Sequence, residues 1–251
     1  MDISSLGNRG YNKITMLDQR FWKKYFEVYD CLNLLIPYQE LIKTIIDNLD
    51  IKEGDLILDL GSGTGNIAVQ VEKLGAKVVG IDSSEEGVRV HKNKLPNSEV
   101  MVGDITQRLP FENNYFDKIY SNNVIYTIPK EKRNFLFSEL YRVLKPGGIV
   151  VVSNVMEGFK PITIYLNHLK RQIKLDGLFY TFLKVIKLIV PTLKMFYYNS
   201  KIKRENRLGE YSFLQDGEQL KLLTEAGFDN ISKEMDVYAN QALLASATKN
   251  A

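Results

Sequence analysis

The nine residues LDLGSGTGN, at positions 58–66, form the stretch best suited to bind a nucleotide-like ligand. A glycine loop directly after an apolar strand lets the backbone approach a ligand closely. The dinucleotide fingerprint places a third glycine three residues after the second, yet Asn66 stands there, after Gly61 and Gly63. Asp59 adds a carboxylate that would oppose a pyrophosphate and suit a ligand with an ammonium and a sulfonium. The loop therefore favours a cationic nucleoside ligand.

Two further acids follow predicted strands and strengthen this interpretation. Asp82 lies about twenty residues after the loop, where its carboxylate can accept hydrogen bonds from both ribose hydroxyls. Asp104 ends the next strand and can accept from an adenine amino group. Hydrogen bonds to a charged partner contribute roughly 1.5–3 kcal/mol each. Either acid alone is explained as a helix cap or turn residue, but both in register with the glycine loop indicate a nucleoside site.

Alternating strands and helices are predicted to position these residues. The predicted strands are 55–60, 77–82, 99–105, 116–124 and 149–155, and the helices between them are 66–74, 83–95 and 131–144. Near-continuous apolar strands of this kind form a parallel sheet covered by helices on both faces. Ligands of such sheets bind at the carboxyl edge of the strands, where Asp59, Asp82 and Asp104 would meet.

The end of the chain is predicted to close the sheet with an antiparallel hairpin. A helix over 217–228 has Asp216 and Gln219 as candidate capping residues. The apolar runs 230–237 and 241–248 are separated only by YAN, which is too short for a parallel crossover. Further back, KPGG at 145–148 is expected to stop the helix and turn the chain before the fifth strand.

In combination, these motifs resemble those of the class I S-adenosylmethionine-dependent methyltransferases. The resemblance rests on LDLGSGTG, VVGIDSS, VMVGDITQRLPFENNYFDKIYSNNVIYTI and LYRVLKPGGIVVVSNV. It covers residues 37–155 and 211–248 and implies a Rossmann-like seven-stranded sheet, mostly parallel, whose last strand is antiparallel. It also implies a methyltransferase that uses S-adenosylmethionine and releases S-adenosylhomocysteine.

The resemblance implies roles for individual residues around that cofactor. Gly61, Ser62 and Gly63 would approach the methionine part, with Asp59 beside them, and Asp82 with Ser83 would lie at the ribose. Asp104 and Ile105 would hold the adenine. Ser121 and Asn122, just past the fourth strand, would close over the sulfonium.

The methyl acceptor is expected to be a small molecule or lipid. The sequence SNNVIY after the fourth strand lacks the proline pair of amino-methylating DNA enzymes, and no recognisable RNA-binding module is present. FEVYDCLNLL loosely resembles the opening of quinone C-methyltransferases, but Asn122-Asn123 stands where those enzymes have Arg-Asn, so no substrate residue is carried over. Tyr11, Tyr25 and Tyr126 are candidate pocket residues. His168 is a candidate general base.

The segment 156–210 is predicted to be a helical insertion between the fifth and sixth strands. It holds 11 Lys and Arg against 4 Asp and Glu, in a chain of net charge +3. On a helical wheel its apolar side chains share one face, with Lys184 and Lys187 opposite; these are Leu178, Phe182, Val185, Ile186 and Ile189. One interpretation is an ordinary amphipathic lid with this face on the core. The other is an apolar tunnel or membrane-facing lid for a prenylated or acylated acceptor, in peripheral contact with anionic headgroups.

Composition and length limit the other possibilities. With Cys31 as the only cysteine and two histidines, neither an internal disulfide nor a metal site is expected. The N-terminus lacks a secretory signal, so we expect a cytoplasmic protein. We predict one domain over 1–251, with a cap at 1–36 and the lid at 156–210. A non-catalytic S-adenosylmethionine-binding module and an NAD(P)-dependent oxidoreductase remain as alternatives.

Overall fold

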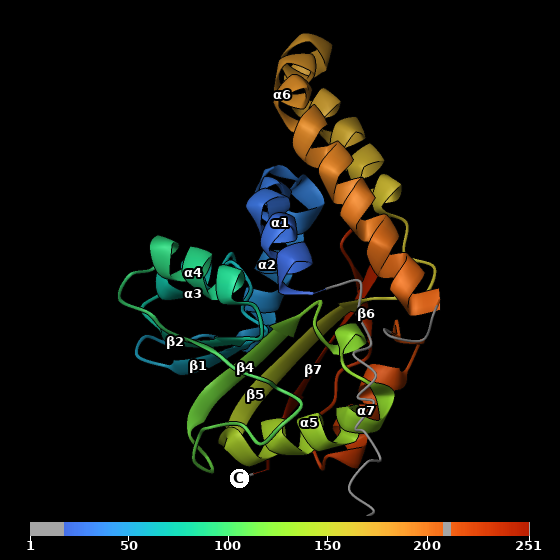
Figure 1. The fold of residues 1–251 in the computed structure, drawn as a ribbon. Coiled ribbons are helices and arrows are strands. Elements are labelled where there is room, and N and C mark those ends of the chain that lie inside the picture. The colour runs from blue at the N-terminus through green and yellow to red at the C-terminus, as the bar shows by residue number, and fades with distance from the viewer. Residues whose placement is uncertain (1–17, 208–211, 251) are drawn as a thin grey trace, which may run out of the picture.

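A seven-stranded sheet forms the centre of the computed structural model, which describes residues 18–207 and 212–250 (Figure 1). The strands lie in the order β3-β2-β1-β4-β5-β7-β6. Their bounds are β1 Leu56–Leu60, β2 Lys77–Asp82, β3 Glu99–Val102, β4 Phe116–Asn122, β5 Leu144–Val155, β6 Met235–Val237 and β7 Ala242–Thr248. The pairs among β1 to β5 are parallel, whereas β7 runs antiparallel to both β5 and β6. The predicted fold class is confirmed.

Helices cover both faces of the sheet, as alternating strands and helices predict. On one face lie α2 (Ile36–Leu49), α3 (Ala68–Glu72) and α4 (Glu85–Lys94), and on the other lie α5 (Lys130–Val143) and α7 (Glu218–Glu225) (Figure 1). Ser84 caps α4 by accepting a hydrogen bond from the Gly87 N–H. The remaining N-terminal helices are α1 (Gln19–Tyr29) and the short η1 (Asp30–Leu34), and η2 (Ile125–Thr127) follows β4.

The helix α6 (Pro161–Arg207) projects away from the sheet as two arms (Figure 1). They meet at Gly177, whose φ of 78° and ψ of 171° break the helical path. The predicted helical insertion is present, and of the two interpretations of its apolar face, packing on the core is contradicted. Phe182 and Ile186 are exposed, and so are Leu178 and Ile189. No helix in the described ranges is long and apolar enough to cross a bilayer.

Three local predictions differ from the structure. The helix stops before KPGG as predicted, since α5 ends at Val143, but KPGG lies within β5 and not in a separate turn. The register shift between Phe116 and Lys118 and the φ of 76° at Gly147 mark an irregularity there. Gly217, with a φ of 78°, occupies the N-cap position of α7 in place of Asp216. Gln219 is buried and bonds to Asn154 and to the Leu243 carbonyl, so its side chain is not available for a cap.

Arg133 on α5 is one of the largest fully buried side chains and joins α5 to α7. Its guanidinium donates to the carbonyl oxygens of Ile128 and Ser212 and to the Glu218 carboxylate at 2.5 Å. Removing one partner of a buried charge pair leaves the other partners unsatisfied, which costs several kcal/mol.

We therefore expect Arg133→Leu to lower the free energy of unfolding by about 3 kcal/mol, as measured by urea denaturation. Lys132→Leu, at an exposed position of the same helix, serves as the control and should change stability by less than about 0.5 kcal/mol. Equal stability of the two variants would contradict a structural role for the buried guanidinium.

Candidate active site

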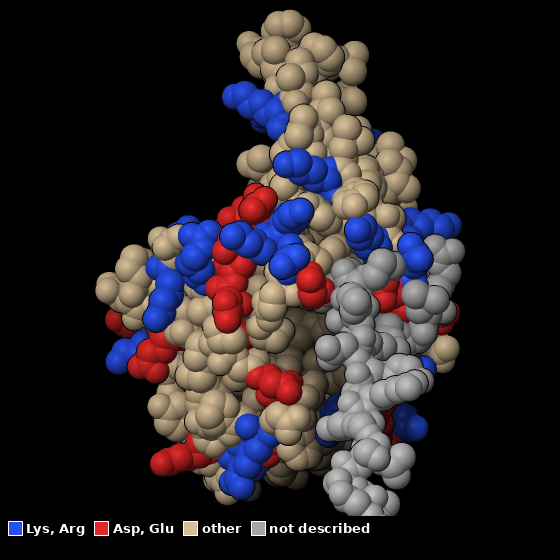
Figure 2. Space-filling model, in the orientation of Figure 1, with Lys and Arg blue, Asp and Glu red and all other residues tan. Residues whose placement is uncertain are grey.

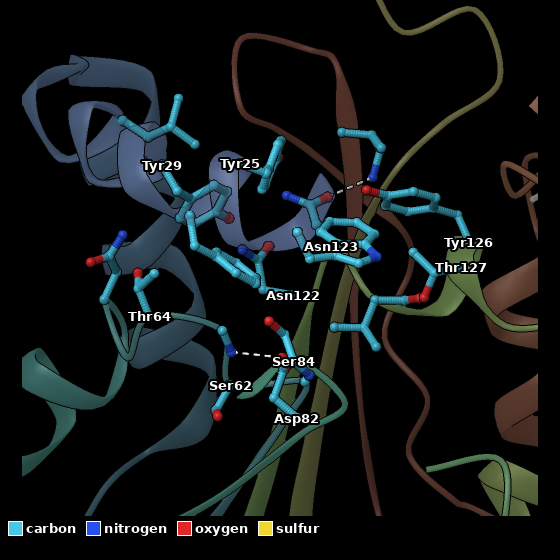
Figure 3. Close-up of a pocket in the computed structure, with 18 of the residues that line it drawn as sticks. Tyr25, Tyr29, Ser62, Thr64, Asp82, Ser84, Asn122, Asn123, Tyr126 and Thr127 are labelled. Carbon is cyan, nitrogen blue, oxygen red and sulfur yellow. Dashed lines mark hydrogen bonds between the residues drawn. The ribbon is translucent and has the colours of Figure 1, made fainter. Parts of the chain in front are cut away.

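A cavity of about 300 Å³ lies at the carboxyl edge of the sheet and holds most of the predicted site residues (Figure 3). Nine of the predicted cofactor residues line it: Asp59, Gly61, Ser62, Gly63, Asp82, Ser83, Asp104, Ile105 and Asn122. The candidate acceptor residues Tyr25 and Tyr126 also line it, whereas Tyr11 lies outside the described residues. The topology thus brings together residues from four parallel strands and from the N-terminal helices.

The glycine loop is shaped by the backbone freedom of its residues. Gly61 has a φ of 74°, and a Cβ built there would lie 2.2 Å from a methyl carbon of Val124. A side chain at this position would therefore clash with the segment after β4 as well as strain the backbone. The bare loop instead lets the Gly63 N–H reach the Asp82 carboxylate at 2.8 Å.

Asp82 is held in place by two backbone donors. One carboxylate oxygen accepts from the Gly63 N–H and the other from the Ser84 N–H, both at 2.8 Å (Figure 3). A carboxylate has about four acceptor positions, so one on each oxygen remains for a ligand. Burial raises the pKa of this carboxyl, partly offset by the two N–H groups. The geometry fits the expected role of accepting from two ribose hydroxyls.

Asp59 is buried beside the loop, and burial raises its pKa to about 8. This pKa reflects burial first, an opposing hydrogen bond with Tyr120 second, and a smaller upward contribution from Asp82. A buried carboxylate of this kind is stabilised by a cationic ligand and destabilised by an anionic one. Together, Asp59 and Asp82 make this end of the cavity suitable for ammonium and sulfonium groups.

Asp104 and Ile105 stand where the adenine is expected. Partial desolvation raises the pKa of Asp104, but hydrogen bonds from the Thr106 hydroxyl and N–H outweigh this effect and lower it. Both bonds go to the same carboxylate oxygen. The Gln107 side chain also hydrogen-bonds this carboxyl. Because a carboxylate has about four acceptor positions, the exposed Asp104 keeps capacity for an amino group of a ligand.

Several buried polar atoms near the loop find no hydrogen-bond partner among the described residues. They include the hydroxyl oxygens of Ser62 and Ser121 and the amide oxygen of Asn122. Ser62 and Asn122 line the cavity, while Ser121 is buried but does not line it. Because unsatisfied buried polar atoms are costly, those in the lining indicate a polar ligand. With the glycine cradle and Asp82, they fit the methionine and ribose parts of S-adenosylmethionine.

The other end of the cavity is aromatic. Its rings come from α1, α2, η2, α6 and the segments before α6 and β7. They are Trp22, Tyr25, Phe26, Tyr29, Tyr38, Tyr126, Phe159, Tyr165 and Tyr238. Burial raises the pKa of Tyr38 to about 12 and those of Tyr25 and Tyr238 well above their ordinary value. These phenols therefore stay protonated and can donate hydrogen bonds.

Most of this aromatic wall was not predicted from the sequence. Phe159 and Tyr165 belong to the 156–210 segment that was interpreted as a possible acceptor tunnel. Five members were not identified, because they are far apart in the chain and no local motif joins them: Trp22, Phe26, Tyr29, Tyr38 and Tyr238. The only available signal was the density of aromatic residues in the N-terminal helices, where Trp22 and Tyr29 flank Tyr25.

Both histidines are buried. His168 does not line the cavity; it is buried, and its Nδ1 accepts from the Ile36 N–H at 3.3 Å. Its placement does not support a role as general base. His91 is fully buried beneath the glycine loop, where Gly65 and Gly80 leave room for its ring.

A polar network ties the N-terminal helices to the glycine loop. Asp30 accepts from the Thr64 hydroxyl at 2.8 Å and from the Lys94 ammonium at 2.7 Å. The amide oxygen of Asn66 accepts from Lys94 at 2.6 Å and from Asn33 at 2.9 Å. The residue that replaces the third glycine of a dinucleotide loop therefore anchors the N-terminal segment over the cavity.

Removing the Asp82 carboxylate should weaken cofactor binding strongly. We expect Asp82→Ala to raise the dissociation constant of S-adenosylhomocysteine at least about a hundredfold, because two charge-assisted hydrogen bonds are lost. Isothermal titration calorimetry measures this change. Glu99→Ala removes an exposed carboxylate at the start of β3 and should leave the affinity unchanged. A similar loss in both variants would contradict a ribose-binding role.

Binding of S-adenosylmethionine should depend on the protonation of Asp59. Because its pKa in the free protein is about 8, most molecules carry the neutral acid at pH 7 and must release a proton to pair with a cation. Affinity should therefore rise with pH, by up to about tenfold per unit between about pH 6 and pH 7. Asp59→Asn should bind more weakly and without this slope. A slope that persists in the variant would assign the titration to another group.

Comparisons with known proteins agree with this geometry. A family model described as "Methyltransferase domain" matches residues 58–152. A demethylmenaquinone methyltransferase of Staphylococcus saprophyticus is 29% identical over 220 residues, covering 81% of this chain and 84% of that protein. Another, from Paenarthrobacter aurescens, is 30% identical and covers 68% of this chain and 66% of that protein.

Solved structures show the same fold. The Haemonchus contortus phosphoethanolamine N-methyltransferase 2, in complex with phosphomonomethylethanolamine and S-adenosylhomocysteine, has a TM-score of 0.64 at 20% identity. It covers 94% of this chain and 59% of that one. The motifs, the sheet order and these matches agree: the chain belongs to the class I S-adenosylmethionine-dependent methyltransferases.

Proposed function

We propose that this methyltransferase acts on an uncharged, ring-bearing, lipid-like acceptor of the prenylated quinol class. The observation that carries the proposal is the charge of the cavity. Its described lining contains three aspartates and no lysine, arginine or histidine. Two of the aligned relatives are named demethylmenaquinone methyltransferases, which supports the same class.

The electrostatics of the cavity disfavour an anionic acceptor. A phosphate or carboxylate brought into a partly desolvated site needs a cationic or strongly hydrogen-bonding partner. The described part of the lining offers no cation, and the Asp82 carboxylate would repel the anion. A phosphorylated amine, such as the ligand of the Haemonchus contortus enzyme, is therefore a poor match for this cavity.

The aromatic end of the cavity suits a flat ring. Tyr25 lies within 5.3 Å of Trp22 and of Tyr29 between ring centroids, and Tyr38 lies 5.8 Å from Tyr238. Rings of this kind can pack against an aromatic acceptor, and their protonated phenols can donate to its oxygens. Asn199 adds an amide and Met195 a flexible apolar side chain from α6.

Methyl transfer requires mainly that the acceptor atom be aligned with the methyl group of the cofactor. S-adenosylmethionine, when bound, would supply an electrophilic methyl group and leave as S-adenosylhomocysteine, and the quinol acceptor would release its proton to water. Positioning the two reactants can contribute effective molarities of about 10⁵–10⁸ M. In this protein Asp59 and Asp82 would orient the cofactor, and the aromatic wall would hold the acceptor ring and exclude water.

The proposal predicts which acceptors receive a labelled methyl group. The purified chain with methyl-labelled S-adenosylmethionine should label a prenylated demethylnaphthoquinol kept reduced, and should not label phosphoethanolamine. Tyr25→Phe and Tyr238→Phe should each lower kcat/KM for the quinol by about 3- to 10-fold through loss of one hydrogen bond.

Tyr115→Phe is the matched control, because Tyr115 is exposed and lies outside the cavity lining. Its kcat/KM and the affinity of all three variants for S-adenosylhomocysteine should equal those of the wild type. Transfer to phosphoethanolamine at a comparable rate would overturn the assignment of acceptor class. Cofactor binding without transfer to either compound would favour a non-catalytic module.

A further inference from the structure

The outer half of α6 exposes a large apolar surface. Residues 175–183, called the α6 tip, lie farthest from the sheet (Figure 1). Exposed side chains there are Leu175, Leu178, Phe179, Tyr180, Phe182 and Leu183, each between 45% and 73% exposed. The exposed surface continues down the second arm as an outer stripe of Ile186, Ile189, Val190 and Leu193. Monomeric proteins seldom expose contiguous apolar surface of this extent without a binding role.

Charged groups are arranged around this surface rather than within it. The space-filling view shows no lysine, arginine, aspartate or glutamate at the end of α6, with lysines and arginines below it (Figure 2). Asp176, the only charged residue of the tip, accepts hydrogen bonds from Gln172 and Lys184. Lys187 and Lys194 are exposed beside the outer stripe. An apolar patch edged by lysines complements a surface with an apolar interior beneath an anionic outer layer.

From this arrangement we infer that α6 docks the protein on a bilayer that carries anionic headgroups, with the α6 tip and the outer stripe inserted at the headgroup boundary. The helix would lie along the interface, as amphipathic interfacial helices do, and would not span the membrane. This interaction surface does not depend on the identity of the methyl acceptor.

A second copy of the chain fits the surface less well. Successive helical residues point about 100° apart, so the exposed run 178–180 presents apolar side chains around most of the circumference of the helix. A protein partner would cover only one face of the α6 tip, whereas the apolar part of a bilayer would surround the inserted side chains. Pairing through the outer stripe by two-fold symmetry would also bring Lys187 and Lys194 of both copies near one another.

The same helix connects the docking surface to the cavity. Ile164, Tyr165, Met195 and Asn199 of α6 line the cavity, and the exposed Tyr197 extends the apolar surface to the level of Asn199. The arms are held together near this point by the rings of Tyr165 and Phe196, whose centroids lie 5.1 Å apart. A docked α6 would therefore place the aromatic end of the cavity next to the membrane surface.

Vesicle co-sedimentation of the full chain, without acceptor or cofactor, tests the inference. Wild-type protein should bind vesicles of phosphatidylcholine with phosphatidylglycerol more tightly than vesicles of phosphatidylcholine alone, and more tightly at low salt than at high salt. The double variant Phe179→Ser, Phe182→Ser should bind at least about tenfold more weakly. Its control, Leu74→Ser with Phe135→Ser, removes exposed apolar side chains elsewhere and should bind like the wild type.

Two further measurements separate insertion from simple charge attraction. Lys187→Gln with Lys194→Gln should lose most of the phosphatidylglycerol dependence, whereas Lys43→Gln with Lys221→Gln, of equal net charge, should keep it. Phe179→Trp should shift its fluorescence to the blue on vesicle addition, and Leu74→Trp should not.

Absence of vesicle binding, or binding that the tip variant leaves unchanged, would overturn the inference. Self-association that the tip variant abolishes, with no vesicle binding, would overturn it in favour of a second copy. Because no acceptor is present, none of these outcomes decides whether the proposed quinol is methylated.

Discussion

The carboxylate of Asp82 is the interaction on which the site depends. It joins three elements, since it ends β2, accepts from Gly63 in the glycine loop and accepts from Ser84 at the start of α4. These bonds fix the loop in the conformation in which its backbone faces the cavity. They also leave acceptor positions free on a carboxylate that is already ordered, so the protein need not reorganise it when a ribose binds.

The second constraint is the distribution of charge within one cavity. Acidic groups gather at the end formed by the strands, where the sulfonium cofactor of this family belongs, and aromatic rings gather at the end formed by α1 and α6. The polar network of Asp30, Lys94 and Asn66 holds the N-terminal segment against the glycine loop. The cofactor half and the aromatic half of the cavity are thereby kept in a fixed relation, which a transfer reaction between two bound molecules requires.

The sequence predicted those parts of the fold and of the site that depend on residues close together in the chain. Strand periodicity and the short final gap predicted a mostly parallel sheet with an antiparallel end, because each feature depends on a few neighbouring residues. The glycine spacing and the acids at strand ends, with the family resemblance that they support, predicted nine lining residues. The aromatic wall was largely missed, since Trp22, Tyr165 and Tyr238 meet only after the chain has folded. Burial was also misjudged: the helical wheel found the apolar face of α6, but nothing in the periodicity showed whether the core would cover it. The burial of His91 also depends on residues far from it in the chain, because Gly65 and Gly80 leave space for its ring.

The acidic, aromatic cavity, with no cation in its described lining, fits an uncharged lipid-like ring as the methyl acceptor. The most direct test is to incubate the protein with methyl-labelled S-adenosylmethionine and an extract of its source cells, and then to separate neutral lipids from anionic and water-soluble metabolites. Label should appear in the neutral lipid fraction and should be lost with Asp82→Ala. Label confined to phosphorylated or other anionic water-soluble compounds would contradict it.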